Sequence, residues 1–311
     1  MQDLGRTGHA HEGYPECGAM DVLSFEIANS LVGNSRTAAA LECTALGPGV
    51  RIHGRVIAAA SPNAGLAVNG NHVEPGKPLL LGDGDTLDMT AIDGFRAYLA
   101  FRGGISVPEV LGSRSTDMKS RIGGLEGRRL KAGDRLKIGK TGNSLQGAFL
   151  RWRAAHASLP AHPWTHAPSQ VIHVTLGPQK VHFTERGIAT FLSGTYTISM
   201  DSNRMGLRLE GPKIESDGGT DILSDGIMNG SIQVATGGLP IIMTADHQTT
   251  GGYAKIAAVI PTDLPVLAQM KPGEHIRFES VSEENALACY MACMESVDRL
   301  RKDMMIWEKW I

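Results

Sequence analysis

The most informative stretch of the sequence is Ala245-Asp246-His247-Gln248-Thr249-Thr250-Gly251-Gly252-Tyr253-Ala254-Lys255-Ile256-Ala257. Strand-like apolar residues precede it at Pro240–Met243 and lead out of it at Ile256–Ile260. Between these strands we expect a loop that presents polar groups to a ligand. The paired glycines Gly251-Gly252 allow positive φ or a close approach of the backbone to that ligand. A polar hairpin loop with glycines for the turn is the alternative interpretation.

The bulk composition excludes several classes of protein. The 311 residues suffice for one large or two ordinary domains. The formal net charge of -2 provides no basic field for nucleic acid or for an anionic membrane. No apolar run approaches the roughly 20 residues of a membrane helix, and the first residues lack an apolar signal core. We therefore expect a cytoplasmic protein. The four cysteines form no metal-ligand pattern, so we expect no metal site.

Strand-like and glycine-rich segments dominate the chain, and helical patterns are few. We predict a mainly β fold with a few helices, in two β-barrel-like domains. Residues 1–140 form the expected N-terminal β domain, residues 141–170 a linker without strand alternation, and residues 171–311 a C-terminal β domain that ends in a helix. A hairpin is expected at Val68–Asn71, which carries an Asn-Gly turn signal. Helices are expected at Asp21–Val32, Glu185–Leu192 and Asp263–Met270, and a last helix is expected to be capped by Ser282.

The last helix carries an apolar stripe that we expect to pack against the sheet, with a partner's groove as the alternative. The stripe consists of Leu287, Tyr290, Met291, Met294, Val297 and Leu300.

Two other stretches, Ser113–Thr116 and Gly123–Arg129, combine glycines, hydroxyls and arginines. Backbone amides and arginine side chains of such loops bind anions. A pair of turns with solvated arginines is the alternative, and the residues by themselves favour it.

The stretch that begins at Asp246 resembles the signature of the allophanate hydrolase subunit 2 family, also called KipA. This family is similar to biotin-dependent carboxyltransferases, and it includes the C subunit of 5-oxoprolinase and the matching part of urea carboxylase. The resemblance covers nearly the whole chain and includes Gln2–Arg6, Gly18–Asp21, Ala28–Asn34, Arg96–Ala100, Leu111–Asp117, Gly123–Arg128, Ser202–Gly206 and Gly230–Val234. Family members usually carry a short strand ahead of the Gln2–Arg6 motif, so we expect this sequence to open later than theirs.

The resemblance implies a carboxyltransferase-like scaffold with a cyclophilin-like second half, acting on small cyclic amides or urea-type groups. The Ser115-Thr116-Asp117-x-Lys119 and Gly123–Arg128 details look closest to the C subunit of 5-oxoprolinase. That branch implies an ATP-dependent amidohydrolase subunit that opens the lactam of 5-oxoproline to glutamate. Its partners are the A subunit of 5-oxoprolinase and the KipI-like B subunit, which share the binding of ATP, and the chain is expected to be inactive without them.

Two alternative functions remain open. One is the carboxyltransferase component of a urea carboxylase or allophanate hydrolase-type system. The residues around Met270-Lys271 do not match a biotin acceptor, so we expect no covalent biotin on this chain. The other alternative is a non-catalytic, KipA-like regulatory binding module, which predicts no turnover with any partner.

The resemblance implies four candidate catalytic residues, which we assign by their positions in the family's motifs. Lys255 and Arg204 suit a carboxylate, a phosphate or a developing oxyanion. Asp246 suits taking or positioning a proton, and Gln248 suits hydrogen bonds in both directions with a lactam or ureido group. The expected substrate-binding residues are Thr249, Thr250, Gly251, Gly252, Asn203, Arg114, Ser115 and Asn34.

Overall fold

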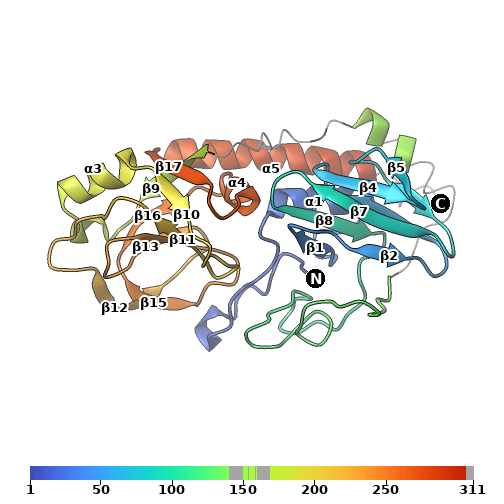
Figure 1. Ribbon diagram of the computed structural model, residues 1–311, viewed down its shortest axis with the longest axis horizontal. Helices are drawn as coiled ribbons and strands as arrows, with labels where there is room; N and C mark the ends of the chain where they lie inside the picture. The colour runs from blue at the N-terminus through green and yellow to red at the C-terminus, as the bar shows by residue number, and fades with distance from the viewer. Residues whose placement is uncertain (140–149, 153, 158, 160–168, 306–311) are drawn as a thin grey trace. The chain divides into compact units, whose positions relative to one another are not determined.

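The computed structural model describes residues 1–139, 150–152, 154–157, 159 and 169–305 (Figure 1). The chain divides into two compact units, and each unit combines separate parts of the sequence. Unit 1 combines Met1–Arg6, a stretch that begins at Asp21, and the end of the chain from Cys293. Unit 2 combines Thr7–Met20 with a stretch that ends at Ala292. Most of the expected linker at 141–170 lies outside the described residues.

Unit 1 includes two antiparallel sheets of four strands each and a helix that packs on one of them. Helix α1 (Val22–Leu31) begins after Asp21, whose carboxylate accepts a hydrogen bond from Ser24 N at 2.9 Å, and it packs on β8 and β3 (Figure 1). The first sheet has the order β1 (Leu41–Thr44), β8 (Arg96–Phe101), β3 (Val56–Ala60), β6 (Leu79–Leu81). The second has the order β2 (Gly49–Arg51), β7 (Thr86–Ile92), β4 (Ala64–Val68), β5 (Asn71–Val73).

The hairpin expected at Val68–Asn71 is confirmed. Strands β4 and β5 pair antiparallel on either side of Asn69 and Gly70. These two residues have φ of 50° and 78°. The two-residue hairpin turn with two positive φ angles favours the Asn-Gly pair, because both residues tolerate the left-handed region.

Unit 2 is built around a closed barrel of seven strands. Their order is β10 (Tyr196–Ile198), β11 (Gly206–Glu210), β14 (Pro240–Met243), β13 (Ser231–Val234), β16 (Lys255–Val259), β9 (Ser169–Leu176), β17 (His275–Ser280). All neighbouring pairs are antiparallel except β9 and β17, which run parallel. A separate two-stranded sheet joins β12 (Asp221–Gly226) to β15 (Thr250–Tyr253). The mainly β prediction is confirmed, and the cyclophilin-like character of this unit stays a prediction.

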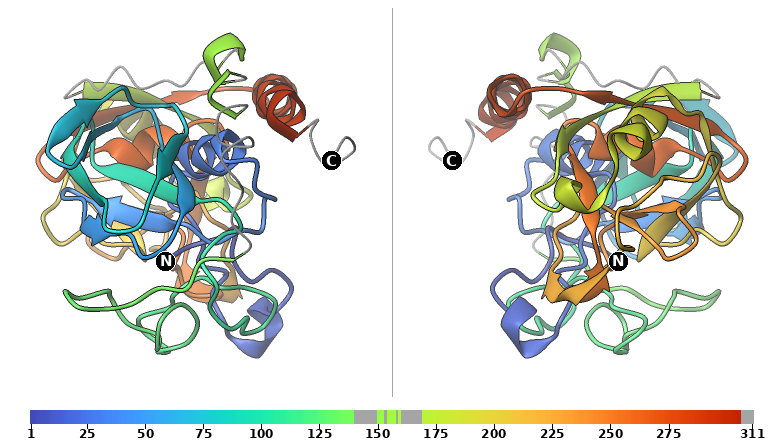
Figure 2. Two further views of the ribbon diagram at one scale, coloured as in Figure 1. Left: turned by 90° about the vertical axis from the view of Figure 1, so that its right-hand side faces the viewer. Right: turned by 90° about the vertical axis from the view of Figure 1, so that its left-hand side faces the viewer.

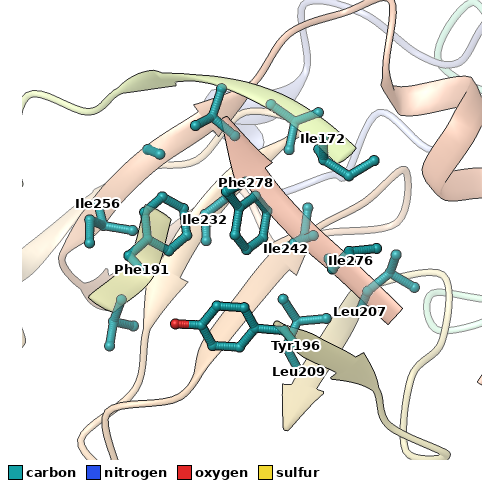
Figure 3. Packing of buried hydrophobic residues seen from close by; sticks show 14 of the residues in the cluster. Ile172, Phe191, Tyr196, Leu207, Leu209, Ile232, Ile242, Ile256, Ile276 and Phe278 are labelled. Atoms are coloured by element: carbon teal, nitrogen blue, oxygen red, sulfur yellow. The ribbon is translucent and has the colours of Figure 1, made fainter. Parts of the chain in front are cut away.

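Aromatic rings and isoleucines fill the barrel (Figure 3). Phe191, from helix α3 (Glu185–Ser193), stacks on Phe278 of β17 with ring centroids 4.4 Å apart. The ring of Tyr196 lies 5.7 Å from that of Phe278. Alternate residues of the strands supply the rest, as the two-residue period of a strand requires; they include Ile232, Ile242, Ile256 and Ile276, all fully buried. The barrel therefore gives its strand ends a rigid frame.

The expected helices are confirmed with small shifts at their ends. Helix α3 is capped by Thr184, whose hydroxyl accepts from Gly187 N, and helix α4 spans Leu264–Gln269. The last helix, α5 (Glu283–Met305), begins after Ser282, which accepts from Asn285 N at 3.2 Å (Figure 2). Two short 3-10 helices, η1 (Ala10–Glu12) and η2 (Lys180–His182), are also present. Among the described helices, none combines the length and apolar character that crossing a bilayer requires.

The apolar stripe of α5 is buried in one half of the helix, and the packing expected for it is wrong for the other half. Val297 and Leu300 are buried within unit 1. Leu287, Tyr290 and Met291, which belong to unit 2, are exposed. The boundary between the units falls within α5, so the apolar stripe is buried only in the part of the helix that belongs to unit 1.

Candidate functional site

The stretch that follows β14 is partly a strand, and the loop expected over its whole length is wrong. Thr250–Tyr253 forms β15, which pairs antiparallel with β12. Only residues 244–249 connect β14 to β15 as a turn. The strand was hidden because its partner, β12, comes from a separate part of the sequence and its own composition is polar and glycine-rich. The polar groups are therefore divided between a turn and a strand.

Of the paired glycines, Gly251 serves packing against protein side chains. Neither Gly251 nor Gly252 has a positive φ, so the turn role of the alternative interpretation is wrong. A Cβ atom on Gly251 would lie 2.6 Å from Ile227 Cδ1 and 2.8 Å from Gln233 Nε2. A Cβ atom on Gly252 would meet nothing nearer than 3.4 Å. Gly251 thus lets β15 approach the buried Gln233 of β13, whose amide also donates to Tyr253 O at 3.0 Å.

Lys255, the first residue of β16, is held in a closed network of hydrogen bonds. Its Nζ atom donates to Asp225 Oδ2 at 2.7 Å and to Gly226 O at 3.0 Å, both at the end of β12. Gln179, in the turn after β9, accepts from Lys255 N at 3.0 Å and donates to Asp225 Oδ2 at 2.8 Å. Asp225 Oδ1 accepts from Gly226 N at 2.8 Å. The network fixes the amine and the carboxylate relative to the barrel.

The network is open to solvent on the side of the carboxylate. The side chain of Lys255 is 9% exposed, and that of Asp225 is 54% exposed. The hydrogen bond from Lys255, followed by those from Gln179 and Gly226 N, lowers the pKa of Asp225 to about 2. An ammonium group carries three N–H donors, and two of those on Lys255 bind protein atoms within the described residues. The third is available for an oxygen atom of a ligand.

Arg204 and Asp246 form a second, more enclosed ion pair. Arg204 Nε and Nη2 donate to the two carboxylate oxygens of Asp246 at 2.9 and 2.8 Å. Nη2 also donates to Gly18 O at 2.7 Å. The carbonyl oxygen of Arg204 accepts from Asp246 N at 2.8 Å and from Thr244 Oγ1 at 2.7 Å. Both oxygens of Asp246 are therefore occupied, and the pair fastens the turn after β14 to the turn before β11 and to the segment Thr7–Met20.

The other expected contacts in unit 2 differ in how free their side chains are. Gln248 is half-buried, and within the described residues its side-chain amide has no hydrogen-bond partner. Thr249 is half-buried and accepts from Ile227 N at 3.0 Å through its carbonyl oxygen. Thr250 is exposed and lies opposite Gly226 in the β12–β15 pair. Asn203 is exposed, and its Oδ1 accepts from Met205 N at 2.7 Å, which makes it a turn residue.

The three expected substrate contacts in unit 1 are held by the protein itself. Asn34 is buried; its amide donates to Asn29 Oδ1 and Phe101 O and accepts from Gly103 N, all within 2.9 Å. Ser115 is fully buried, and its hydroxyl donates to Asp3 Oδ1 at 2.6 Å. Arg114 forms an ion pair with Glu109 at 2.7 Å near the surface. These contacts give the residues structural roles.

The chain matches a known family over most of its length. The family is described as carboxyltransferase domain, subdomain A and B, and the match covers residues 12–280. The chain belongs to this family. It is 37% identical over 301 residues to the C subunit of 5-oxoprolinase from Escherichia coli (strain K12), a match that covers 92% of this chain and 89% of that protein.

Larger proteins contain the same carboxyltransferase domain. The urea amidolyase of Lachancea kluyveri is 37% identical over 308 residues, which cover 92% of this chain and 16% of that protein. The crystal structure of the Kluyveromyces lactis urea carboxylase superposes with a TM-score of 0.83 at 31% identity, covering 98% of this chain and 28% of that one. The chain thus corresponds to a minor part of these two proteins.

Two residues of the carboxyltransferase-domain site were missed from the sequence. Asp225 and Gln179 hold Lys255, yet they lie 30 and 76 residues before it. The dipeptide Asp225-Gly226 is a turn signal, but it carries no information about a partner lysine. Gln179 stands in a polar turn after β9, where an amide is unremarkable. Only the folded unit, which brings the barrel strands β9 and β16 together with β12 of the two-stranded sheet, makes them recognisable.

Proposed function

We propose that this carboxyltransferase-domain chain is the C subunit of a multi-subunit, ATP-dependent 5-oxoprolinase, which opens 5-oxoproline to glutamate together with the A and B subunits. The observation that carries the proposal is the reciprocal match to the C subunit of Escherichia coli 5-oxoprolinase, which spans 92% of one chain and 89% of the other. The urea amidolyase match covers as much of this chain and only 16% of the relative. This chain thus corresponds better to a separate subunit than to one domain of a larger protein.

The proposed reaction proceeds through an activated lactam. The γ-phosphoryl group of ATP moves to the lactam oxygen, and ADP leaves. Water then attacks the lactam carbon, the C–N bond breaks, and the ring nitrogen takes a proton, which leaves an acyl phosphate. A second water hydrolyses this acyl phosphate to the free carboxylate, and phosphate leaves. A cation and hydrogen-bond donors near the lactam oxygen stabilise the charge that develops there. ATP binding falls, in this proposal, to the partner subunits or to their contact with this chain.

Within this chain, Lys255 is the residue best placed to assist that step. Its amine is paired with Asp225, and one N–H remains for the lactam oxygen. Gln248, whose amide is available, suits the lactam N–H and C=O. Asp246 and Arg204 support the turn that carries Gln248, because their ion pair fixes its first residues. The substrate roles proposed for Lys255 and Gln248 thus differ from the anchoring role of the Arg204–Asp246 pair.

The test is glutamate release from 5-oxoproline and ATP by this chain mixed with its cognate A and B subunits. Assembly is checked by size-exclusion chromatography and folding by circular dichroism. Lys255→Ala is expected to lower turnover by about 100-fold or more, as loss of an oxyanion donor does. Lys271→Ala, which changes a turn lysine after α4, serves as the matched control and is expected to retain activity. An assembled complex without activity, or full activity in Lys255→Ala, contradicts the proposal or its site, respectively.

A second candidate is the carboxyltransferase component of a urea carboxylase. The structural match to the Kluyveromyces lactis urea carboxylase, with a TM-score of 0.83, favours it. This function requires a biotin carried by another protein or domain. Incorporation of labelled bicarbonate into urea, in the presence of a biotin carboxylase and a biotinylated carrier, distinguishes it from lactam opening. Labelled product without glutamate release from 5-oxoproline selects the carboxyltransferase.

A further inference from the structure

The guanidinium group of Arg6 is fully buried and poorly partnered. Its exposed fraction is 0%, which makes it the largest completely enclosed side chain of the described residues. Nη2 donates to Ser115 O at 2.5 Å. Nε and Nη1 have no hydrogen-bond partner among the described residues. Burying a cation without a compensating charge or hydrogen bonds is strongly unfavourable, so a group of this kind indicates an anion.

The nearest carboxylate in the sequence does not provide that anion. Asp3 Oδ1 accepts from Gly5 N at 2.9 Å and from the hydroxyls of Ser113 and Ser115 at 2.6 Å. Asp3 Oδ2 accepts from Arg114 N at 2.6 Å. Both oxygens are thus satisfied by neutral donors. Throughout the described ranges, no ion pair includes the Arg6 side chain.

A second unpartnered buried atom belongs to the same cluster. Gln2 Nε2 donates to Thr116 O at 3.3 Å, one residue along the chain from the carbonyl that binds Arg6. Gln2 Oε1 is buried and has no partner among the described residues. The cluster therefore offers unused donors from Arg6 and an unused acceptor from Gln2. Protonated oxyanions, such as bicarbonate or hydrogen phosphate, present both kinds of group.

The loops that cover Arg6 have the backbone of an anion-binding site. A Cβ atom on Gly123 would lie 2.1 Å from Ser115 O and 2.9 Å from Arg6 Nη2, so only glycine fits over the guanidinium. Gly123 and Gly124 both have positive φ, and so do the non-glycine residues Arg121 and Glu126. Consecutive turns of this kind create concave sets of amides that bind anions. Left-handed non-glycine residues are costly and concentrate at functional sites.

We propose that Arg6 forms the base of a binding site for a small oxyanion, closed by the loop 121–127. The site lies entirely within unit 1, and its case does not depend on the 5-oxoprolinase assignment. Because the guanidinium is enclosed, the anion enters only when the loop 121–127 opens. Binding therefore stabilises the closed loop, and opening of the loop requires release of the anion.

The experiment uses the full chain and three probes: sodium bicarbonate, sodium phosphate and sodium acetate, each at constant ionic strength balanced with chloride. Hydrogen exchange, read by mass spectrometry, is followed in peptides that cover residues 111–127. Above its dissociation constant, the bound anion is expected to slow exchange there roughly tenfold for each tenfold increase in concentration. Peptides from the barrel core of unit 2 report any general salt effect. The order of the three half-saturation concentrations separates bicarbonate, phosphate and simple carboxylates.

Two variants test the assignment to Arg6. Arg6→Gln is expected to abolish the anion response, whereas Arg114→Gln, which removes a guanidinium paired near the surface with Glu109, is expected to keep it. If Arg6→Gln does not fold, the wild-type titration decides by itself. The absence of any saturable slowing with all three anions overturns the proposal. A response that survives in Arg6→Gln, or that disappears in Arg114→Gln, also overturns it.

Discussion

Asp3 joins the first residues of the chain to the loop at 113–115, and its removal is expected to destabilise unit 1 strongly. Its buried carboxylate accepts four hydrogen bonds, from Gly5 N, Arg114 N and the hydroxyls of Ser113 and Ser115. In Asp3→Ala the hydroxyls are free to turn to other acceptors, but the two N–H groups lose a charged partner. At ~1.5–3 kcal/mol for each of these two bonds, the expected loss is about 3–6 kcal/mol of unfolding free energy.

The variant Asp3→Asn keeps the shape of this side chain and removes its negative charge. The amide keeps one acceptor but places an NH₂ group against Arg114 N if Oδ1 retains its hydroxyl contacts, so we expect a loss of about 2 kcal/mol. Urea unfolding followed by circular dichroism measures the free energy. Hydrogen exchange in residues 111–127 assigns the loss to unit 1. Asp201→Asn, at an exposed turn position, is the control and is expected to change stability by less than ~0.5 kcal/mol. An Asp3→Ala variant within about 1 kcal/mol of wild type refutes the reasoning.

Three further predictions concern unit 2 and the thiols. Because the pKa of Asp225 is lowered from 3.8 to about 2, its contribution to stability is present above pH 3.8 and lost as the pH falls toward 2. The variant Asp225→Asn is expected to lose this part of the acid-unfolding curve. An unchanged curve contradicts the ion pair. Gly251→Ala is expected to cost ~1–3 kcal/mol by overpacking against Ile227 and Gln233, whereas Gly252→Ala is tolerated; equal unfolding midpoints argue against the close approach. In thiol labelling, the exposed Cys289 is expected to react first, and Cys293, whose pKa is raised by burial, more slowly. Burial raises the pKa of Cys43 to about 12, so this thiol is expected to react only after unfolding. Early labelling of Cys43 contradicts its burial.

Local signals in the sequence were sufficient for most elements. The helix that begins after Asp21 was predictable because the aspartate caps it and an apolar stripe follows. The Asn69-Gly70 hairpin was predictable because the turn type demands two residues that tolerate positive φ. These features depend on neighbours within a few residues, and a single sequence displays them directly.

The remaining features depend on contacts between distant segments. Thr250–Tyr253 reads as a loop, since its strand character comes only from pairing with β12. Lys255 was recognised as a functional candidate, but its carboxylate partner was not, because several aspartates compete and none is marked by spacing. The ion pair of Asp246 with Arg204 could not be predicted from the sequence either, because the two residues lie 42 positions apart. The burial of Arg6 likewise arises from loops more than 100 residues later.

The parallel pairing of β9 with β17 has a consequence for the synthesis of the protein on the ribosome. Strand β9 begins at Ser169 and β17 at His275, 106 residues later, and β9's other neighbour, β16, begins only at Lys255. At roughly 5–20 residues per second, β9 waits about 5–20 s for its last partner. Until β16 is synthesised, both edges of β9 are unpaired, and Ile172 and Val174, which end in the barrel core, have no core to enter. The nascent chain thus passes through an aggregation-prone period that chaperones protect.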